Sequence, residues 1–403
     1  MNLFSGNIKI GIYIAKDHLW FKTYKEDSLP FGLKAILSEL DLSRYEASFC
    51  NIDSVNNFDF VFYSVNSTID YLVLIRDFYA MKSRKFKLVL GGADLINLHL
   101  LREITDIAVV GRAEGQINQV LNGVPFSNVW TKEDYNLQKK YEVRQPQYLL
   151  KVGNKSEVNV GCLRRCRFCQ YGNKFPQFIK GKKYNSGTDN LESMFTDIDW
   201  SLAISRIVSS IDGSTEGSRS KAGKPLSNET ILNKIREAYN VPNYKPLLAR
   251  ICNIIGYPWE DESIANLSEL KEVLKLADNN KKTHKIWIDF QFLHFIPMLL
   301  TPMESEAVNL IDYKSLMFGK PIYDGLNIKA IYRNSFTSRV NTLDKVYTYR
   351  SFEIDNHILH MAESRYFRIP EGKRYSWYLN HSDRHDIVTN LPSKIYEQHR
   401  DEL

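Results

Sequence analysis

The feature that most constrains this chain is a group of three cysteines, Cys162, Cys166 and Cys169, which lie within eight positions at the spacing C-x3-C-x2-C. Thiolates this close together can converge on one soft metal centre. A structural zinc site, or an iron–sulfur cube held by protein alone, has four ligands, so three cysteines leave one coordination position open. Catalytic metal sites keep such an open position, and the rest of the sequence can be interpreted around it.

The other two cysteines, Cys50 and Cys252, each lie alone in an apolar run. Neither has a second cysteine or a histidine at ligand spacing, and we expect Cys252 to be part of a packed core. A zinc knuckle completed by a nearby histidine is disfavoured, because His18, His99 and His284 are distant in the sequence. Clustered cysteines without a disulfide pattern fit a reducing compartment.

Composition limits the class of protein only broadly. The 403 residues can form two domains or one large one, with a substantial core. No apolar run reaches the roughly 20 residues that span a bilayer, and residues 1–20 lack the layout of a signal peptide. We therefore expect a cytoplasmic protein with no membrane partner. The net charge of +6 is compatible with a polyanionic partner.

The first third of the chain alternates between strand-like and helix-like segments, with glycine just past several strand ends. This alternation predicts a doubly wound parallel sheet. Strands are predicted at 8–14, 58–65, 87–90 and 107–110, and helices at 31–40 and 68–82.

Three segments of this region, 62–65, 90–93 and 109–115, resemble the amino-terminal Rossmann-like domain of cobalamin-type radical S-adenosylmethionine (radical SAM) enzymes. The resemblance covers roughly residues 8–123. The Asp-x-His-x-x-Gly pattern that supplies the lower ligand of cobalamin is absent, since Asp17 and His18 are adjacent. Either the domain binds cobalamin without a histidine ligand, or it has lost cobalamin and become structural. We favour the second alternative.

The cysteine spacing, with Gly161 before the first cysteine and Phe168 before the last, resembles the radical SAM motif. This resemblance implies a [4Fe–4S] cluster on Cys162, Cys166 and Cys169. It also implies that S-adenosylmethionine chelates the open iron and is cleaved by an electron from the cluster, which gives a 5′-deoxyadenosyl radical. Phe168 is expected to contact the cofactors. An electron donor such as a flavodoxin or a ferredoxin is implied as a partner.

Further strands are predicted at 204–211, 247–255 and 285–296. The segment 212–229 after the first of them resembles the family's stretch that meets the ribose and carboxylate of S-adenosylmethionine, with Ser214, Glu216 and Arg219 in those roles. The turn that begins at Gly256 resembles the family's turn beside the adenine. A carboxylate can accept from ribose hydroxyls, and a guanidinium can bind a carboxylate through two hydrogen bonds.

The predicted fold is therefore α/β, with a Rossmann-like amino-terminal domain and a partial (β/α)6 radical SAM barrel. The expected divisions are the Rossmann-like domain at 1–123, a linker at 124–156, the barrel at 157–303 and an extension at 304–403 that caps the barrel or contacts substrate.

The substrate is less constrained than the initiating chemistry. Basic and aromatic residues between 365 and 378 suit stacking on bases and contact with phosphates. We expect a radical SAM enzyme that modifies or rearranges a nucleoside or nucleic-acid base, of which viral DNA hypermodification is one version. The alternatives are a cobalamin-dependent radical SAM methyltransferase acting on a small molecule or peptide, and a nucleic-acid-binding protein with a structural iron–sulfur cluster. No residue is assigned to the substrate radical.

Overall fold

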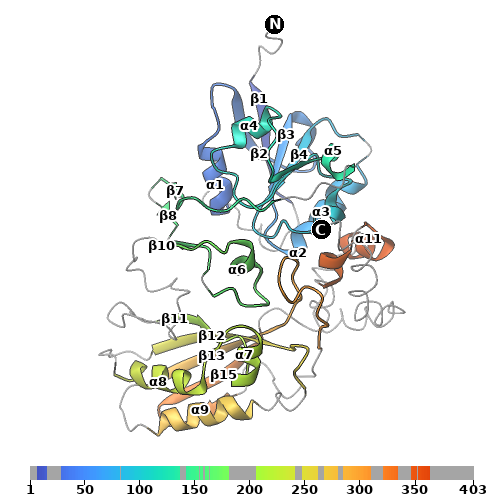
Figure 1. Ribbon diagram of the computed structural model, residues 1–403. Helices are drawn as coiled ribbons and strands as arrows, with labels where there is room; N and C mark the ends of the chain where they lie inside the picture. Colours follow the sequence, from blue (N-terminus) through green and yellow to red (C-terminus); the bar gives the residue numbers. More distant parts are fainter. Residues whose placement is uncertain are drawn as a thin grey trace. The chain divides into compact units, whose positions relative to one another are not determined.

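The chain divides into two compact units in the computed structural model (Figure 1). Unit 1 comprises residues 1–162, 174–181 and 345–403, and unit 2 comprises residues 163–173 and 182–344. The structure describes residues 7–15, 29–81, 83–136, 142–153, 155–157, 159–162, 164–180, 206–240, 247–261, 267–279, 285–309, 321–334, 346–351 and 353–363.

Unit 1 is built on a six-stranded sheet with the order β2-β1-β3-β4-β5-β6. The first five strands pair in parallel, and β6 pairs antiparallel with β5 at one edge. The order reverses between β1 and β3, and doubly wound sheets bind ligands outside the carboxyl ends of their strands at such a reversal. The strands are β1 (Ile8–Tyr13), β2 (Tyr45–Cys50), β3 (Phe60–Ser64), β4 (Lys87–Gly91), β5 (Ile107–Val109) and β6 (Val129–Thr131).

Short helices connect these strands, and one face of the sheet packs on α1 and α4 through Ile10, Phe60, Leu33 and Ile117. The central strands are almost continuously apolar because a parallel sheet is buried on both faces. The helical segments are α1 (Phe31–Ser38), the 3-10 turn η3 (Val55–Asn57), α2 (Thr68–Leu74), the π-helical turn η4 (Ile75–Tyr79), α3 (Leu98–Leu101), α4 (Ile117–Leu121) and α5 (Lys132–Asn136).

Two small antiparallel pairs follow the sheet. One joins β7 (Lys151–Val152) to β8 (Lys155–Ser156), and the other joins β9 (Asn159–Val160) to β10 (Ile179–Lys180). Helix α6 (Gln170–Lys174) lies between β9 and β10 in the sequence, directly after the cysteine motif.

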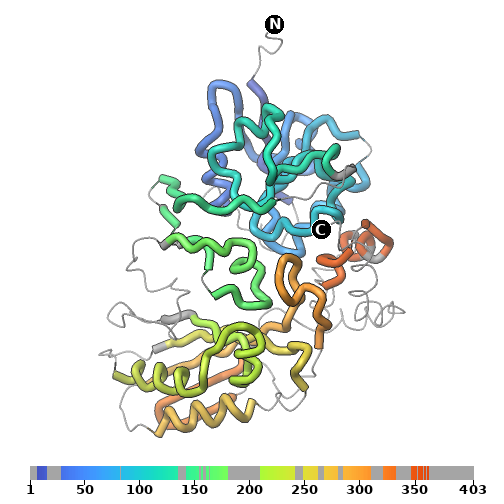
Figure 2. Tube along the Cα trace, in the orientation of Figure 1, coloured from blue at the N-terminus to red at the C-terminus, as the bar shows by residue number. Residues whose placement is uncertain are grey.

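A segment from the far end of the chain completes unit 1, as the trace in Figure 2 shows. Residues 346–350 are helical, and α11 (Asn356–Glu363) packs on α2 and η4. The Asn97 side-chain amide donates to the carbonyls of Thr348 at 3.0 Å, Tyr349 at 3.2 Å and Ser351 at 2.8 Å. These bonds satisfy carbonyls that a helix end leaves without intrahelical partners.

Unit 2 contains a five-stranded sheet with the order β11-β12-β13-β15-β14. Four strands are parallel, and β14 pairs antiparallel with β15. Helices α8 and α9 cover one face, where Ile231, Ile235 and Leu274 pack against Ile251 and Phe290. The strands are β11 (Arg206–Ser210), β12 (Leu247–Ile255), β13 (Ile286–His294), β14 (Pro321–Asp324) and β15 (Ile328–Asn334). The helices are α7 (Glu216–Lys221), α8 (Asn228–Ala238) and α9 (Ser268–Asp278).

The predicted α/β class is confirmed by these two sheets of mostly parallel strands. The sequence did not predict β2, β6, β14 or β15. Strand β6 lies inside the segment predicted as a linker, and its Trp130 is buried. The predicted six β/α repeats stay a prediction, because residues 181–205 lie outside the described part of the chain. None of the helices in the described ranges is long and apolar enough to cross a lipid bilayer.

Candidate functional site

The first cysteine of the motif is fixed by the β9–β10 pair of unit 1. The Cys162 backbone N–H donates to the carbonyl of Phe175 at 3.2 Å. Gly161 has φ +80°, and a Cβ there would lie 1.8 Å from the carbonyl oxygen of Gln177. Only glycine combines this positive φ with such a close approach of two backbones, which gives the glycine before the first cysteine a physical reason.

The second and third cysteines belong to a tight turn of unit 2. The Cys169 N–H donates to the Cys166 carbonyl at 3.0 Å. The Asn173 amide donates to the carbonyls of Cys166 at 3.0 Å and Cys169 at 2.8 Å. Arg165 adopts φ +44°, a conformation that side-chain-bearing residues rarely hold outside functional or tightly constrained sites. The turn is thus held by its own hydrogen bonds.

This turn docks on the carboxyl-terminal end of α7. The Arg167 N–H donates to the Ala222 carbonyl at 2.9 Å, and its guanidinium donates to the Lys221 carbonyl at 3.1 Å. Gly223 follows with φ +76°, and a Cβ there would lie 3.2 Å from the Arg167 nitrogen. The glycine therefore ends the helix and leaves room for the cysteine turn.

An aromatic cluster joins the same turn to the segment that begins at Gly256. Phe168 lies with its ring centroid 6.0 Å from that of Tyr257, which stacks on Trp259 at 4.9 Å and lies 5.2 Å from Phe295. Burial is the main reason why the pKa of Tyr257 is raised well above its ordinary value, and the nearby carboxylates and the Cys166 and Cys169 thiols add to it. Tyr257 is therefore a neutral hydroxyl, which donates to the Asp212 carbonyl at 3.1 Å.

The Gly256 turn is organised by Glu260. This buried carboxylate accepts from the N–H of Gly256 at 2.7 Å, the N–H of Tyr257 at 3.2 Å and the hydroxyl of Ser218 at 2.6 Å. Burial raises the pKa of Glu260, and these hydrogen bonds oppose the rise. Gly256 itself has φ +81°, and a Cβ would lie 2.5 Å from the Asn309 carbonyl oxygen, so a side chain is excluded there.

Two of the three residues predicted for S-adenosylmethionine are engaged with the protein itself. Arg219 is 0% exposed, and its guanidinium donates to the carbonyls of Leu226 at 2.6 Å and Gly213 at 3.1 Å and to the Asn228 side chain. With these bonds in place, Arg219 organises the 213–228 segment and does not reach out to a ligand. The buried Ser214 hydroxyl accepts from the Asn253 amide at 2.7 Å.

Glu216 is different, because it is exposed in the first turn of α7. One of its carboxylate oxygens accepts the Asn228 N–H at 2.8 Å, so it also caps the start of α8. A contact of Glu216 with a ribose stays a prediction.

The sheet face opposite α8 and α9 carries polar side chains at the carboxyl half of the strands. Ser210, Cys252 and Gln291 occupy paired positions on β11, β12 and β13. Two residues earlier on β12 and β13, Arg250 forms an ion pair with Asp289 at 3.1 Å. Alternate residues of a strand point to opposite faces, so these five side chains share one face, named the polar face below.

A second ion pair lies next to the polar face. Lys224 Nζ donates to Asp212 at 2.5 Å and to the Ser210 hydroxyl at 3.1 Å, and both charged side chains are largely buried. Asp212 adopts φ +52°, a second strained position in this unit. The two ion pairs leave the surroundings of Cys252 polar and close to neutral in net charge.

Sequence reasoning missed most of this arrangement. Cys252 is partly exposed on the polar face, which corrects its assignment to the packed core. The available signal was the alternation Arg250-x-Cys252 and Asp289-x-Gln291 inside otherwise apolar strands, which indicates a strand with one polar face. Asn253 gave a similar signal: its buried side chain accepts the Gly213 N–H at 2.7 Å.

The cysteine motif fits an iron–sulfur cluster by the chemistry of its donors. Within the described residues, no group of three or more His, Cys, Asp or Glu side chains is arranged to hold a metal ion. Cys162 and Cys166 are four residues apart, however, so the chain keeps their Cα atoms within about 14 Å. Residues 161–188 contain no Asp or Glu, and the cations among them favour thiolates.

The carboxyl edge of the unit 1 sheet is the second candidate site. Gly92 follows β4 with φ +114°, and a Cβ there would lie 2.2 Å from the Val65 carbonyl oxygen, so the loops after β3 and β4 are pressed together. The buried Lys174 ammonium, from the end of α6, donates to the Ala93 carbonyl at 3.1 Å. Asn66, just past β3, keeps an exposed side chain at this edge. The segment Asp17-His18 lies outside the described residues.

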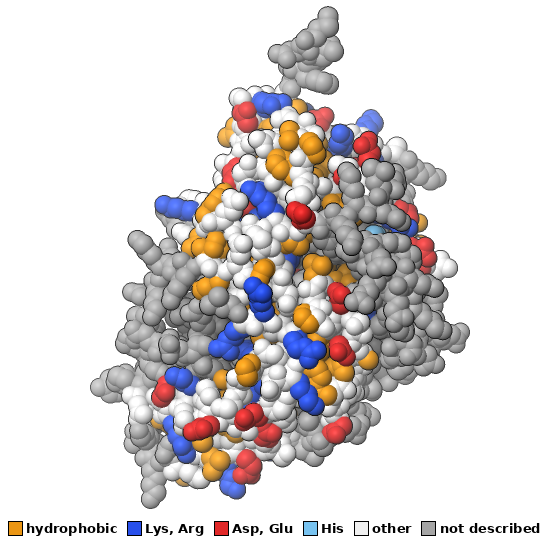
Figure 3. All heavy atoms as spheres, in the orientation of Figure 1, with side chains coloured by type: hydrophobic (Ala, Val, Ile, Leu, Met, Phe, Trp, Pro, Cys, Tyr) orange, Lys and Arg blue, Asp and Glu red, His pale blue; other side chains and the backbone are white. Residues whose placement is uncertain are grey.

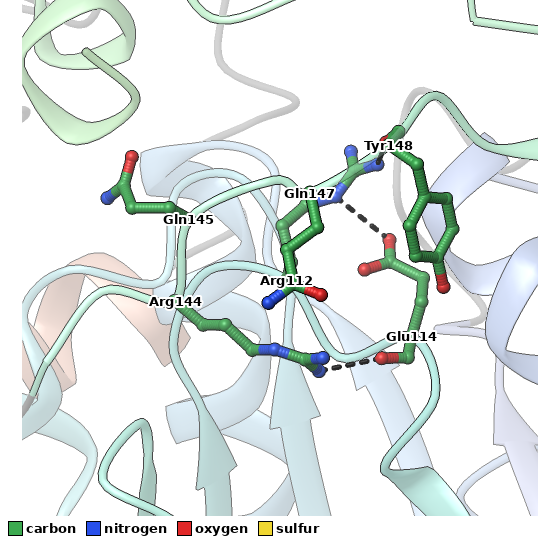
Figure 4. Close-up of a pocket in the computed structure, with 6 residues that line it drawn as sticks. All are labelled: Arg112, Glu114, Arg144, Gln145, Gln147 and Tyr148. Carbon is green, nitrogen blue, oxygen red and sulfur yellow. Dashed lines mark hydrogen bonds and ion pairs between the residues drawn. The ribbon is translucent and has the colours of Figure 1, made fainter. Parts of the chain in front are cut away.

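The segment after β5 closes one end of this edge, around the polar pocket in Figure 4. Arg112 binds both oxygens of Glu157 at 2.7 and 2.8 Å and lies 3.2 Å from Glu114. Arg144 donates to the Glu114 carbonyl at 2.6 Å, as the dashed line shows. The charges of the 111–115 segment therefore fasten residues 142–157 to the sheet and are not available to a ligand.

The fold of this chain is similar to that of known proteins, although its sequence is not. No family model and no curated protein matches the sequence. The structure is similar to that of the radical S-adenosylmethionine methyltransferase TsrM from Kitasatospora setae, solved with cobalamin and a [4Fe–4S] cluster bound. The two share 10% sequence identity over 99% of this chain and 100% of that one, with a TM-score of 0.50.

The structure of the cobalamin-dependent S-adenosylmethionine radical enzyme OxsB, with aqua-cobalamin bound, also matches. It shares 12% identity over 96% of this chain and 72% of that one, with a TM-score of 0.45. The likeness to TsrM shows that this chain has the fold of a cobalamin-type radical SAM protein, which confirms the predicted fold class.

Proposed function

We propose that this chain is a radical SAM enzyme in which Cys162, Cys166 and Cys169 hold a [4Fe–4S] cluster. The observation that carries the proposal is the docking of the cysteine turn on the end of α7, through Arg167 to Ala222, and on Tyr257 at the carboxyl end of the parallel strand β12. Enzymes with parallel barrels build their active sites at this end of the strands. The fold shared with TsrM supports the same proposal.

When bound, the cluster and S-adenosylmethionine would supply the electron and the adenosyl group for radical chemistry. The residues of this chain hold and shape the site. Glu260 fixes the Gly256 turn, and the bonds of Arg219 and Asn253 fix the backbone around Gly213 and Ser214. Phe168 and Tyr257 form an apolar wall beside Cys166 and Cys169 that excludes water.

We further propose that unit 1 binds cobalamin without a histidine ligand, at the carboxyl ends of β1, β3 and β4. The sheet order reverses there, and Gly91 and the exposed Asn66 would face the ligand. The fold is that of an enzyme with cobalamin bound, so the cobalamin-dependent alternative now fits better than the loss of cobalamin that we favoured from the sequence.

The reaction most consistent with this pairing is methyl or group transfer to a small molecule or peptide. The polar face supports a neutral or zwitterionic substrate, because its charged side chains are paired. A nucleoside or nucleic-acid substrate stays a prediction without support from the structure, since the basic and aromatic residues 365–378 lie outside the described part of the chain.

Anaerobic reconstitution tests both parts of the proposal. With iron, sulfide and dithionite, the protein is expected to convert S-adenosylmethionine to 5′-deoxyadenosine or S-adenosylhomocysteine. If neither product formed, a radical SAM function would be excluded. Stoichiometric cobalt, measured after incubation with hydroxocobalamin and gel filtration, is expected as well. Substoichiometric cobalt would instead favour the alternative that unit 1 has lost cobalamin and become structural.

A further inference from the structure

The polar face of the unit 2 sheet is accessible along β12 and β13, whereas the opposite face is covered by α8 and α9. Arg250, Cys252 and Ile254 on β12 are each partly exposed, and the residues between them are buried. Gln291 on β13 is partly exposed as well. Because successive residues of a strand point to opposite faces, this alternation leaves the polar face open to a ligand.

Gln291 carries hydrogen-bonding groups that the protein leaves unused. In the described part of the chain, its side chain makes one hydrogen bond, in which its carbonyl accepts from the Cys252 thiol at 4.0 Å. A thiol is a weak donor, so this long contact satisfies the carbonyl poorly. The two N–H donors of the amide have no acceptor among the described residues. Gln291 therefore offers both donors and an acceptor to a molecule on the polar face.

The position of Gln291 is close to the apolar wall beside the cysteine turn. Gln291 is paired with Cys252 across the two strands. Ile254, two residues after Cys252, packs on the apolar cluster around Tyr257, as Phe168 does. Two residues of a strand span roughly 7 Å, so a molecule the size of an amino acid that binds Gln291 can also reach this wall.

The chemical group that best complements a free carboxamide is a peptide backbone. In an extended peptide, the N–H and C=O of one residue point to the same edge, as they do in an antiparallel sheet. A glutamine side chain can accept from that N–H and donate to that C=O, because it carries an acceptor and two donors. Neither hydrogen bond requires a charge on the ligand.

The charges near Gln291 favour a peptide over a nucleotide. Adenine also complements a carboxamide, but a nucleotide brings a phosphate, which calls for a free cation. Arg250 is engaged by Asp289, and Lys224 is engaged by Asp212. The described part of the surface in Figure 3 carries acidic as well as basic side chains, whereas surfaces that bind nucleic acids are basic.

We infer that Gln291 holds the backbone of a peptide substrate on the polar face. Its carboxamide accepts the N–H and donates to the C=O of one substrate residue. The inference rests on the proposed function, because the peptide is the substrate of the proposed radical SAM enzyme. The Cys252 thiol and the Ser210 hydroxyl occupy the paired positions on β12 and β11, so they lie next to the bound peptide.

The Cys252 thiol reports whether the polar face is occupied. The probe is the capped peptide N-acetyl-dialanine methylamide, added to the full chain after anaerobic reconstitution. The measurement is the rate at which iodoacetamide labels Cys252, followed by peptide mass spectrometry. In the wild type, this rate is expected to fall and then level off as the peptide concentration rises.

Gln291→Leu is expected to need about tenfold more peptide for the same protection, because two hydrogen bonds to the backbone are lost. The matched control, Gln119→Leu, makes the same change on the exposed surface of α4 and should protect like the wild type. The labelling rate without peptide should be equal in all of these proteins. If Gln291→Leu changed that rate, Gln291→Glu would provide the same test, because it keeps the shape of the side chain and loses the N–H donors.

Three outcomes would overturn the inference. Equal protection by the peptide in the wild type and the Gln291 variants would show that this side chain does not hold the backbone. The absence of protection at any soluble peptide concentration would exclude a peptide on the polar face. Protection by deoxyadenosine and not by the peptide would assign the face to a nucleoside. Cleavage of S-adenosylmethionine is measured in the same samples, and its absence would instead count against the proposed function itself.

Discussion

The two mostly parallel sheets differ in what lies at the carboxyl ends of their strands. In unit 1 the loops after β3 and β4 close on each other, with Gly92 pressed on Val65 and Asp70 accepting from the Asn66 N–H at 2.8 Å. In unit 2 the corresponding edge carries the largely buried Lys224–Asp212 ion pair and the docked cysteine turn. The sheet face next to this edge carries the Arg250–Asp289 ion pair and a partly exposed thiol. The same architecture thus gives a tightly packed edge in one unit and a chemically equipped edge in the other.

The two units therefore offer different chemical groups at these edges. Unit 1 offers backbone and small side chains, which suit a large ligand held by many weak contacts. Unit 2 offers charged, thiol and amide groups on one sheet face, which suit the orientation of reacting atoms. The following predictions test this contrast, from the largest expected effect to the smallest.

Replacing Cys162, Cys166 or Cys169 with Ala is expected to abolish the visible absorbance of the cluster and all cleavage of S-adenosylmethionine. Each replacement removes one of the three proposed protein ligands. Cys50→Ala and Cys252→Ala should keep the absorbance, and anaerobic spectra of the five variants provide the measurement. If Cys50→Ala lost the cluster, the assignment of three ligands would be wrong.

Breaking the Lys224–Asp212 ion pair is expected to lower the free energy of unfolding of unit 2 by about 3 to 5 kcal/mol, because the partner's charge is left buried. Lys224→Met is the variant, and urea unfolding is the measurement. The double variant Lys224→Met/Asp212→Leu is expected to recover part of the loss. An effect below about 1 kcal/mol would show that the pair is solvated.

Gly161 and Gly123 form a matched pair in unit 1, with φ values of +80° and +79°. Gly161→Ala places a Cβ against the Gln177 carbonyl and should cost about 3 kcal/mol or more of unfolding free energy. Gly123 has open space around it, so Gly123→Ala should cost only about 1 kcal/mol of backbone strain. Equal losses would mean that the β9–β10 pair does not fix the position of Cys162.

Lys174 gives a pH dependence to unit 1. Burial lowers the pKa of Lys174 from 10.5 to about 8, and the nearby Asp94 opposes this shift only in part. The folded state thus binds fewer protons than the unfolded state between pH 8 and 10.5, so stability rises with pH in this window. The unfolding free energy of the wild type, relative to Lys174→Met, should rise by about 2 to 3 kcal/mol from pH 7.5 to pH 10.5. A flat difference would mean that the ammonium is solvated.

The smallest effect compares the two thiols outside the motif. Burial raises the pKa of Cys50 to about 12, and it raises the pKa of Cys252 as well, but Cys252 is partly exposed on the polar face and Cys50 is buried. Iodoacetamide should therefore label Cys252 about tenfold faster than Cys50. Bound S-adenosylmethionine or substrate is expected to slow the labelling of Cys252 only, as peptide mass spectrometry would show. If Cys50 were labelled faster than Cys252, Cys252 would be the more buried thiol and would belong to the packed core.

Much of the fold could be predicted because its signals are local. The apolar runs at 60–64, 87–91 and 247–255 are long enough to be recognised as strands without knowledge of their neighbours. Strands β2 and β6 were missed because the exposed residues of β2 and the three residues of β6 carry little hydrophobic pattern. Their pairing is supplied by the sheet edges beside them, which no local window contains.

In the candidate site, too, some features could be predicted from the local sequence and others depend on distant residues. The cysteine spacing is local, and by itself it predicts the metal chemistry and the open coordination position. The roles of Arg219, Cys252 and Lys224 depend on residues that are 7 to 39 positions away in the sequence. The tertiary structure turned Arg219 inward, where carbonyls satisfy its guanidinium, and turned Cys252 outward onto a polar face. Only packing decides the direction of a side chain at such positions, because the free energy of burial depends on which partners the fold brings within hydrogen-bond distance.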